Sequence, residues 1–595
     1  MTSLETRVPL LGRAGARARR GGTLRLVGAG DVDHLDPALA YHTVTRGIVR
    51  AFTRQLVTYR STSDVARAGE IVPDLATAAA GPVDTDGRRY RFVLREGVRW
   101  EGGAPVTAAD VARGIKRLAH PSAPSPGLPY FLSTVEGLVE LRDSLLEAGG
   151  RPEAIAEAIE STDVRGLDVE DDRTIVITTV DPVSDFLNVL ALPFATPAPL
   201  AYLSHVPGSR ELEQQLVSCG PYLIAEYRPA KRIRLERNPA WSRATDEVRS
   251  AYVDVIDVHE GLSEDDAYEQ VMAGSADMLW DTQPPTERLP GLFATNDPRL
   301  RVCLAGLLSP YIAINVLSPN AGGATAKVEV RRALQYAVDK QAVAAIWGGP
   351  RLNTIAHQLL PPLSSAHREH RLYESDGDRG APEVARRLLY AAGYPEGLTL
   401  KLVFRNRDIH PATAEAVRDA LARAGVTVEL VPAPIEAFFA DYLASTDAAR
   451  AGAWDIALTG WEADWNGNNA RVFLQPLFDS THVSENDDWG ANFGHYSSAT
   501  VNELLAAGLH CPDEAKANRL FAEAEQQIMR DAAIVPILFA NQYWLHSARV
   551  RDWLPYPVLN GDLTNLWLAD ASRADQAGPS SSSRSTSTGR SRRAP

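Results

Sequence analysis

Hydrophobic and polar residues alternate in several short runs of the chain, and such runs predict β-strands. The run Gly22-Thr-Leu-Arg-Leu-Val27 leads into Gly28-Ala-Gly30, a pattern typical of a first strand and its turn. Tyr222 to Tyr227 and Arg232 to Arg237 flank Pro229-Ala-Lys231 and predict a hairpin. The folded body is therefore expected to begin near Gly21 with a strand.

A second hairpin is predicted between these two regions. Tyr90, Phe92 and Leu94 alternate with polar residues, Glu96-Gly97 supplies a turn, and Val98 and Trp100 continue the apolar face. The segment Thr107-Ala-Ala-Asp110 that follows has the pattern of a capping box and predicts the start of a helix.

The second half of the chain alternates between helical and strand patterns. Apolar residues spaced by three or four positions predict one helix from Val330 to Ile346, closed by Gly348-Gly349. The patterns further on predict a helix from Pro382 to Gly393, a strand over 398–403, a helix over 412–424, a strand over 426–430, a helix over 513–531, and a strand over 534–539. Pro536 assigns the last strand to an edge or a crossing position. This order is typical of an α/β fold.

Length and charge limit the classes of function. A chain of 595 residues exceeds one typical domain, so at least two lobes are expected. Its 61 Lys and Arg against 75 Asp and Glu give a net charge of −14, which makes nucleic acid an unfavourable partner. No apolar run reaches the roughly 20 residues of a membrane-spanning helix. The three cysteines, Cys219, Cys303 and Cys511, permit one disulfide at most and show no zinc-binding spacing.

The two ends of the chain differ from its body. Residues 1–21 form a basic arm whose one apolar stretch, Val8 to Leu11, is far shorter than the core of a secretory signal, so we interpret it as an arm or the remnant of a leader. Residues 571–595 are rich in Ser and Arg and are predicted to be a disordered tail.

Eight motifs in a fixed order resemble solute-binding protein family 5, the extracytoplasmic peptide- and nickel-binding subunits of ABC importers. The resemblance covers about 22–568. The motifs begin with Gly22-Thr-Leu-Arg-Leu with His34-Leu-Asp-Pro37, Tyr90-Arg-Phe-Val-Leu-Arg-Glu-Gly-Val-Arg-Trp100, Pro105-Val-Thr-Ala-Ala-Asp110 and Gly220-Pro-Tyr222. They continue with Leu235-Glu-Arg-Asn-Pro239, Val330-Arg-Arg-Ala-Leu-Gln-Tyr-Ala-Val-Asp339, Leu389-Tyr-Ala-Ala-Gly-Tyr-Pro395 and Trp454-Asp-Ile-Ala.

This resemblance implies an α/β fold of the periplasmic-binding-protein type (type II), in which two lobes close over a ligand at their interface. Lobe I is expected to combine 22–45, 185–285 and 535–570, with a subdomain inserted at 46–184. Lobe II is expected to span 286–534. The implied function is binding of di- to oligopeptides and their delivery to the membrane permease of an ABC importer. The implied location is extracytoplasmic, although the printed sequence shows neither a signal peptide nor a lipid-modified cysteine.

The segment Gly460 to Asn466 holds the main candidate ligand site. In peptide-binding members of the family, the acidic residue at the position of Asp464 receives the α-ammonium group of the ligand, with Trp461 beside the cleft, and a buried carboxylate is suited to that contact. Trp465 and Asn466 belong to the same segment. The alternative is that Asp464 only caps the following helix. Where the family pattern continues with Asp-Pro, this chain has Gly467-Asn-Asn469.

Other candidates carry less specific patterns. Tyr41 and the pair Tyr130-Phe131 are aromatic residues suited to lining a cleft, or else to an ordinary core. Trp489 and His482 follow the Asp464 segment and are candidates through the resemblance. Neither His482 nor the pair His367 and His370 has the neighbours that a metal site requires, and no metal or other cofactor is expected.

Rival functions follow from the same residues. A non-peptide solute, such as an oligosaccharide or a metal chelate, would need no ammonium partner and would stack on tryptophan. An intracellular sensor that reuses the fold is the rival from another class, although no helix-turn-helix fits before Gly22. The G-x-S-x-G, P-loop and dinucleotide motifs of common enzymes are missing, so no enzyme is expected. We expect a monomer.

Overall fold

The computed structural model describes residues 18–62, 64, 67–79, 81–148, 151–350, 352–407, 409–434, 437–465, 467–481, 483, 489–554 and 561–570. The predicted arm at 1–21 lies outside this range up to residue 17, and the predicted tail at 571–595 lies outside it entirely. No helix in the described part is both long enough and apolar enough to cross a bilayer.

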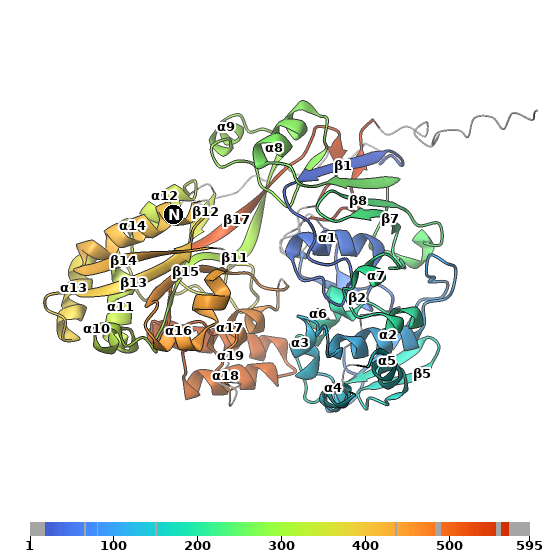
Figure 1. Cartoon of the computed structure of the whole chain (residues 1–595), viewed down its shortest axis with the longest axis horizontal. Coiled ribbons are helices and arrows are strands. Elements are labelled where there is room, and N and C mark those ends of the chain that lie inside the picture. The colour runs from blue at the N-terminus through green and yellow to red at the C-terminus, as the bar shows by residue number, and fades with distance from the viewer. Residues whose placement is uncertain are drawn as a thin grey trace, which may run out of the picture.

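The first lobe, on the right in Figure 1, is built on a five-stranded sheet of order β10-β1-β9-β8-β7. Its strands are β1 (Thr23–Gly28), β7 (Tyr222–Arg228), β8 (Arg232–Arg237), β9 (Val255–His259) and β10 (Met278–Trp280). Strand β1 lies parallel to β9 and β10, whereas β7, β8 and β9 are joined antiparallel. The predicted first strand and the predicted β7–β8 hairpin are thereby confirmed.

A smaller unit below this sheet completes the first lobe in Figure 1. It contains the sheet β4-β6-β5 and the pair β2-β3. Its strands are β2 (Val57–Tyr59), β3 (Ile71–Pro73), β4 (Arg89–Val93), β5 (Leu167–Asp171) and β6 (Thr174–Thr178). The helices of the lobe are α1 (Thr43–Phe52), α2 (Ala108–Lys116), α3 (Leu128–Leu132), α4 (Leu138–Glu147), α5 (Pro152–Ser161), α6 (Phe186–Ala191), α7 (Arg210–Glu213), α8 (Glu264–Ala273) and α9 (Leu289–Ala294).

The predicted hairpin at Tyr90–Trp100 is wrong. Strand β4 pairs antiparallel with β6, with Phe92 opposite Ile175, and not with the residues after Gly97. Val98 and Trp100 are buried in a loop whose one bridge joins Arg99 to Pro105. The capping box is confirmed, because Thr107 accepts from the Asp110 amide and the Asp110 carboxylate accepts from the Thr107 amide.

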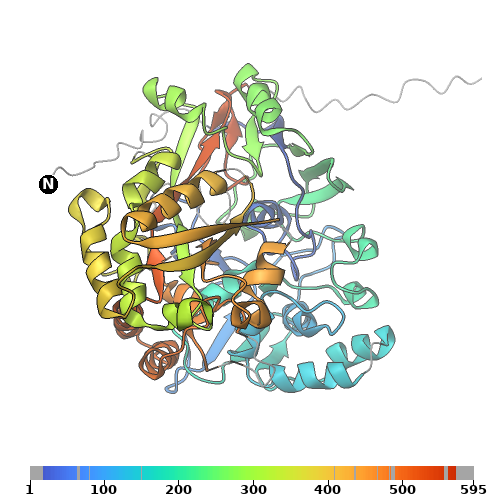
Figure 2. The same cartoon turned by 60° about the vertical axis from the view of Figure 1, so that its left-hand side comes forward.

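The second lobe, on the left in Figure 1, is built on a seven-stranded sheet. Strands β12-β17-β11-β15-β13-β14 follow in order, and β16 also pairs with β11. Figure 2, which brings this lobe forward, shows yellow-green and orange helices packed along the strands. The strands are β11 (Leu300–Ile314), β12 (Asn353–Ile355), β13 (Leu398–Arg405), β14 (Val426–Ala433), β15 (Ile456–Trp461), β16 (Ile534–Pro536) and β17 (Leu538–Leu545).

The helices of the second lobe largely follow the sequence pattern. They are α10 (Asn320–Gly323), α11 (Val328–Ala337), α12 (Lys340–Ile346), α13 (Pro382–Ala391), α14 (His410–Arg423), a π-helical turn (Phe438–Leu443), α16 (Thr446–Arg450), α17 (Ala470–Phe478), α18 (Ala499–Leu509) and α19 (Glu514–Arg530). The single helix predicted over 330–346 is wrong. Val338 and Asp339 are extended, and the Asp339 carboxylate caps α12 by accepting from the Ala342 amide.

Two long strands join the lobes. β11 and β17 run antiparallel from the second lobe toward the top of Figure 1, where Met278 of β10 bridges His546 just after β17. Beyond that point the chain returns to the first lobe, where β18 (Val550–Arg551) pairs with β19 (Trp567–Leu568). Pro536, predicted at an edge or crossing position, lies in β16, opposite Tyr311 of β11. The crossing strands are the connection about which the lobes can move.

Candidate functional site

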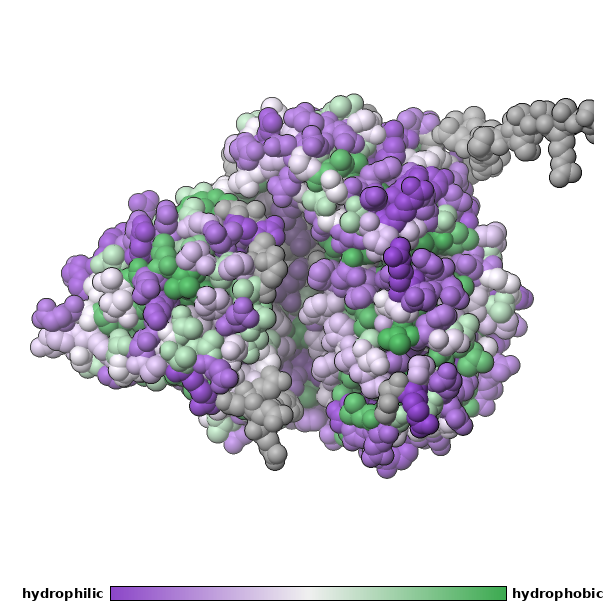
Figure 3. Space-filling view, in the orientation of Figure 1, coloured by the Kyte–Doolittle hydropathy of each residue, from purple (hydrophilic) through white to green (hydrophobic). Residues whose placement is uncertain are grey.

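A deep furrow separates the two lobes in the space-filling view (Figure 3). The chain enters the interface just after β15, where the segment from Glu462 to Trp465 leaves the second lobe and meets helices α1 and α3 of the first. The site is therefore made from residues that are distant in the sequence.

The Asp464 carboxylate is held by two donors from the first lobe. Arg46 Nη2 donates to Oδ1 over 2.6 Å, and the Tyr130 hydroxyl donates to Oδ2 over 2.5 Å. Arg46 Nη1 also donates to the Asp464 carbonyl over 2.8 Å. The side chains of Arg46 and Asp464 are only 2% and 10% exposed. Charge-assisted bonds of this kind are about twice as strong as neutral ones.

Arg46 is itself fixed by its own lobe. Its Nε donates to the Tyr41 carbonyl over 3.2 Å, and its guanidinium lies 5.6 Å from the centre of the Tyr41 ring. Burial lowers the pKa of Arg46, but the Asp464 carboxylate outweighs this and raises it overall. Arg46 therefore stays charged and is the counterion of Asp464.

A second buried ion pair joins the lobes nearby. Arg471 of α17 donates to Asp185, at the start of α6, over 3.1 Å, and both side chains are buried. The Asn468 amide donates to the Ser184 carbonyl over 3.2 Å. We call the two ion pairs and the Tyr130 bond to Asp464 the interlobe clasp. The interlobe clasp therefore stabilises the closed arrangement of the lobes.

Glu462 lies beside the clasp with little to compensate its charge. Among the described residues, its hydrogen-bond donor is Gln542 Nε2 of β17, over a long 3.4 Å. Burial raises the pKa of Glu462 to about 7, with Arg46 lowering it and Asp464 raising it further. Gln542 is only 8% exposed, and its Oε1 has no hydrogen-bond partner among the described residues. Glu462 and Gln542 therefore place oxygen atoms at the interface that could accept further hydrogen bonds.

The two tryptophans of the segment differ in their surroundings. Trp461 is half-buried at the end of β15, opposite Leu308, and its indole N–H donates to the Val472 carbonyl over 2.7 Å. Trp465 is fully buried, donates to the Asn468 carbonyl over 2.7 Å, and packs edge-on against Tyr130 at 5.4 Å between ring centres. Trp465 thus supports Tyr130 from behind.

Tyr41, a predicted site residue, lies beside Arg46 in the first lobe. The residue is 40% exposed, and the Asp464 charge, followed by burial, raises the pKa of Tyr41 to about 12. Of the pair Tyr130-Phe131, Tyr130 joins the clasp, whereas Phe131 is buried in the core. The structure therefore brings Tyr41, Tyr130 and Asp464 together.

The alternative role for Asp464 as a helix cap does not fit the structure. The residue that precedes α17 is Asn469, whose side chain makes no capping bond but donates to the Trp465 carbonyl over 3.0 Å. Asn466 and His482, both predicted site residues, lie outside the described residues.

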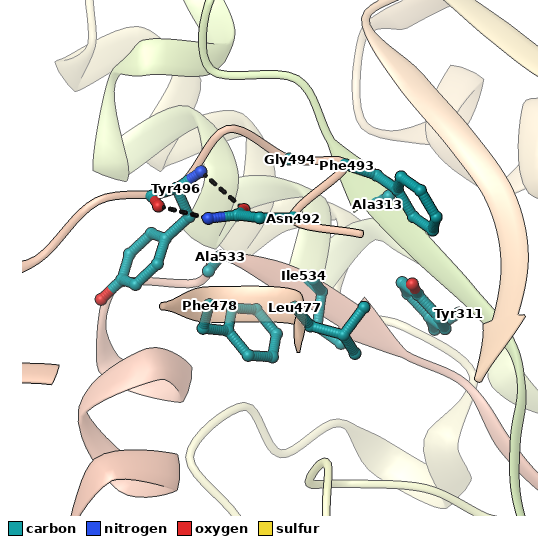
Figure 4. A pocket seen from close by; sticks show the side chains of 10 residues that line it. All are labelled: Tyr311, Ala313, Leu477, Phe478, Asn492, Phe493, Gly494, Tyr496, Ala533 and Ile534. Atoms are coloured by element: carbon teal, nitrogen blue, oxygen red, sulfur yellow. Dashed lines mark hydrogen bonds between the residues drawn. The ribbon is translucent and has the colours of Figure 1, made fainter. Parts of the chain in front are cut away.

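Trp489 begins a segment of the second lobe that leads to a small pocket. Its ring meets His495 edge-on at 5.3 Å. The following residues contribute to a small apolar pocket between β11, α17 and the start of β16 (Figure 4). The pocket is lined by Tyr311, Ala313, Leu477, Phe478, Asn492, Phe493, Gly494, Tyr496, Ala533 and Ile534. None of these side chains is charged, and none belongs to the clasp.

The structure also describes the histidine pair and two of the three cysteines. His367 and His370 each turn Nδ1 toward a backbone carbonyl, those of Leu360 and Arg368. Within the described ranges, no group of three or more His, Cys, Asp or Glu side chains is placed to hold a metal ion. Cys219 and Cys511 are buried free thiols.

Sequence reasoning missed Arg46, Glu462 and Gln542. Arg46 and Glu462 lie in segments whose neighbours were singled out, but an Arg on a helix and a Glu after a strand both have the pattern of solvated residues. Gln542 lies in a strand recognised only by its hydrophobic residues. The role of these three residues becomes visible only in the structure, where the two lobes bring them together.

Comparisons with known proteins agree with this geometry. The model of the family described as bacterial extracellular solute-binding proteins, family 5, matches residues 70–485. The chain is 27% identical over 499 residues to the periplasmic oligopeptide-binding protein OppA of Salmonella typhimurium, covering 81% of each chain. It is also 27% identical over 482 residues to the probable deoxycholate-binding periplasmic protein YgiS of Escherichia coli, covering 79% of this chain and 80% of that one.

Solved structures show the same architecture. The clavulanic acid biosynthesis oligopeptide binding protein 2 superposes with a TM-score of 0.82 at 27% identity, over 93% of this chain and 96% of that one. The unliganded open form of the murein tripeptide binding protein MppA gives a TM-score of 0.68 at 21% identity, over 93% and 98%. The two-lobed fold expected from the sequence is confirmed.

Proposed function

Because the chain belongs to the bacterial extracellular solute-binding proteins of family 5, we propose that it binds peptides between its lobes and delivers them to the permease of an ABC importer. The names of OppA and of the clavulanic acid biosynthesis protein, both 27% identical to this chain, support the peptide class. The observation that carries the proposal is the buried cluster of charged side chains at the lobe interface.

This cluster lies where opening of the lobes would expose it. Arg46 and Tyr130 come from one lobe and Asp464 and Glu462 from the other, so the groups come together only in the closed form. A solute that contacts both lobes favours closure by its differential affinity for the closed form. Binding and release of the solute would thereby be coupled to lobe movement, without a covalent step.

The proposal also covers the oligomeric state of the protein, its location and the limits of its lobes. The chain acts as a monomer and binds without catalysis. It acts outside the cytoplasm, as the relatives named periplasmic support. The lobe limits expected from the sequence, 22–45 with 185–285 and 535–570 against 286–534, and the subdomain at 46–184, are the units proposed to move. Helix α9, whose Leu289 packs with Leu279, is proposed to move with the first lobe. Of the ligand-site residues expected from the sequence, Tyr41, Trp461 and Asp464 are proposed to act at the interface and Trp465 to support Tyr130. Asn466, Trp489 and His482 stay proposals from the sequence alone.

A non-peptide solute is the second candidate function, and one observation favours it. Asp464 already holds a cation, Arg46, so a solute without an ammonium group leaves the clasp intact. The relative named for deoxycholate is as similar to this chain as the relative named for oligopeptides.

Isothermal titration calorimetry separates the two candidates. The purified protein is titrated with Ala-Ala-Ala, with its N-acetylated form and with a disaccharide series. The peptide proposal predicts micromolar or tighter binding of at least one peptide and no binding of the sugars. Saccharide binding without peptide binding would overturn it. Fractionation of cells that express the native gene tests the location, and a wholly cytosolic protein would favour the intracellular sensor.

A further inference from the structure

The interface offers two carboxylates to a solute, and only one of them has a cation. Asp464 receives one donor on each oxygen, and one of those donors is a buried guanidinium. A solute cation that took Asp464 would leave Arg46, which is 2% exposed, without its counterion. An uncompensated buried charge is strongly unfavourable. Asp464 is therefore a poor partner for an incoming cation as long as the lobes are closed.

Glu462 is in the opposite situation. Within the described part of the chain, no Lys, Arg or His side chain comes within ion-pair distance of it, and its one hydrogen-bond donor is the amide of Gln542. It is half-buried, so it keeps contact with solvent in the interface. Arg46, Asp464 and Glu462 together leave one negative charge when both carboxylates are ionised.

Gln542 points to the same ligand chemistry independently. Its Oε1 is buried and has no donor, and buried acceptors are almost always satisfied in folded proteins. Gln542 comes from β17, one of the strands that join the lobes, so this acceptor and Glu462 meet beside the connection. A group with several N–H donors and a positive charge would satisfy both.

We propose that Glu462, assisted by Gln542, is the partner of a cationic group of the solute, and that Arg46 reserves Asp464 for closing the lobes. The inference rests on the proposed solute-binding function and specifies its substrate class: an ammonium or guanidinium group, from either the amino terminus or a basic side chain. Asp464, the expected receiver of the ammonium group, is then a residue that positions the lobes.

Calorimetry with matched peptides tests the assignment. Acetyl-Ala-Arg-Ala is compared with acetyl-Ala-citrulline-Ala, which keeps the shape and lacks the charge, and Ala-Ala-Ala with its acetylated form. In the wild type, at least one cationic member binds tenfold or more tightly than its neutral partner. Glu462→Gln removes that preference and leaves the neutral peptide unaffected. If the arginine and citrulline peptides lose their difference in affinity, the cation is a basic side chain. If Ala-Ala-Ala and its acetylated form lose theirs, the cation is the amino terminus.

Two controls keep the outcomes distinct. Glu503→Gln, which neutralises an exposed carboxylate on α18, leaves every affinity unchanged. Peptide binding with the same cationic preference in Glu462→Gln and wild type overturns this inference while the proposed function stands. If no peptide binds, the proposed peptide function fails, and thermal shifts with arginine, agmatine and citrulline decide the inference. Stabilisation by the two cations that Glu462→Gln abolishes supports it, and equal shifts in both proteins overturn it.

Discussion

Arg46 and Asp464 are 418 positions apart in the chain, yet Nη2 of one lies 2.6 Å from Oδ1 of the other in the closed interface. Each residue belongs to a different lobe, so their ion pair exists only when the lobes meet. The pair is therefore a measure of closure as well as part of the site.

Loss of this pair is expected to open the lobes. Asp464→Asn leaves the Arg46 guanidinium without the carboxylate that it pairs with, and separation of the lobes allows the guanidinium to be hydrated. Small-angle X-ray scattering should show a larger radius of gyration than for the wild type. Glu247→Gln, which breaks the more exposed Arg95 pair within the first lobe, is the matched control and should cause no change. Equal radii for wild type and Asp464→Asn would contradict the clasp.

The Tyr130 hydroxyl is expected to contribute to closure without carrying charge. Tyr130→Phe removes one hydrogen bond to a carboxylate, worth about 1.5–3 kcal/mol, and keeps the ring contact with Trp465. Because solute affinity follows the population of the closed form, we expect affinity to fall about tenfold for charged and neutral solutes alike. Tyr390→Phe, on an exposed ring, is the control. An unchanged affinity would exclude this hydrogen bond from closure.

Binding of a cation through Glu462 should depend on pH. The pKa of Glu462 is raised to about 7, and a solute cation prefers the ionised form, so binding releases protons below that pH. Between pH 6 and pH 8 the affinity for acetyl-Ala-Arg-Ala should rise about tenfold, as the ionised fraction does. The neighbouring Arg46 keeps its charge in this range, because the Asp464 carboxylate raises the pKa of Arg46. Glu462→Gln should give a flat profile, and a wild-type profile equally flat would contradict the assignment.

The same carboxylate should lower the stability of the solute-free protein at high pH. Its folded pKa of about 7 exceeds the ordinary 4.5, so the favourable neutral form is fully present below pH 4.5 and is lost as the pH rises through 7. Glu462→Gln avoids this loss and should gain about 2 kcal/mol at pH 8, after allowance for solvent contact, and little at pH 4.5. Thermal melts at both values measure the difference. A gain that is equal at both pH values would rule out titration as its cause.

Trp465 is expected to matter for stability more than for contact with the solute. It is fully buried behind Tyr130, so Trp465→Ala should cost about 3–5 kcal/mol in the free energy of unfolding. Denaturant titration measures this cost. Unchanged stability combined with lost binding would instead place the ring on the surface that meets the solute.

Local patterns predicted local structure well. The hairpin of β7 and β8 needs only a tight turn between adjacent strands, and Ala230 adopts φ +54° there. The capping box at Thr107 likewise lies within four residues. Such elements are specified by neighbours in the sequence, and the sequence pattern is sufficient to find them.

Contacts between residues far apart in the sequence could not be predicted from local patterns. Strand β4 pairs with a strand about 80 positions later, which no periodicity indicates, and so the hairpin at Tyr90–Trp100 was predicted wrongly. The break between α11 and α12 was marked only by Asp339, whose capping role competes with a continuous apolar stripe. At the site, the pattern led to Asp464 and Tyr41, but the partner that occupies Asp464 comes from the other lobe.

Native mass spectrometry of the protein as purified, followed by denaturing release and sequencing of whatever is bound, tests the central claim most directly. The account predicts a ladder of peptide masses, enriched in basic residues or free amino termini. A single non-peptide mass, or a metal ion, would contradict peptide binding.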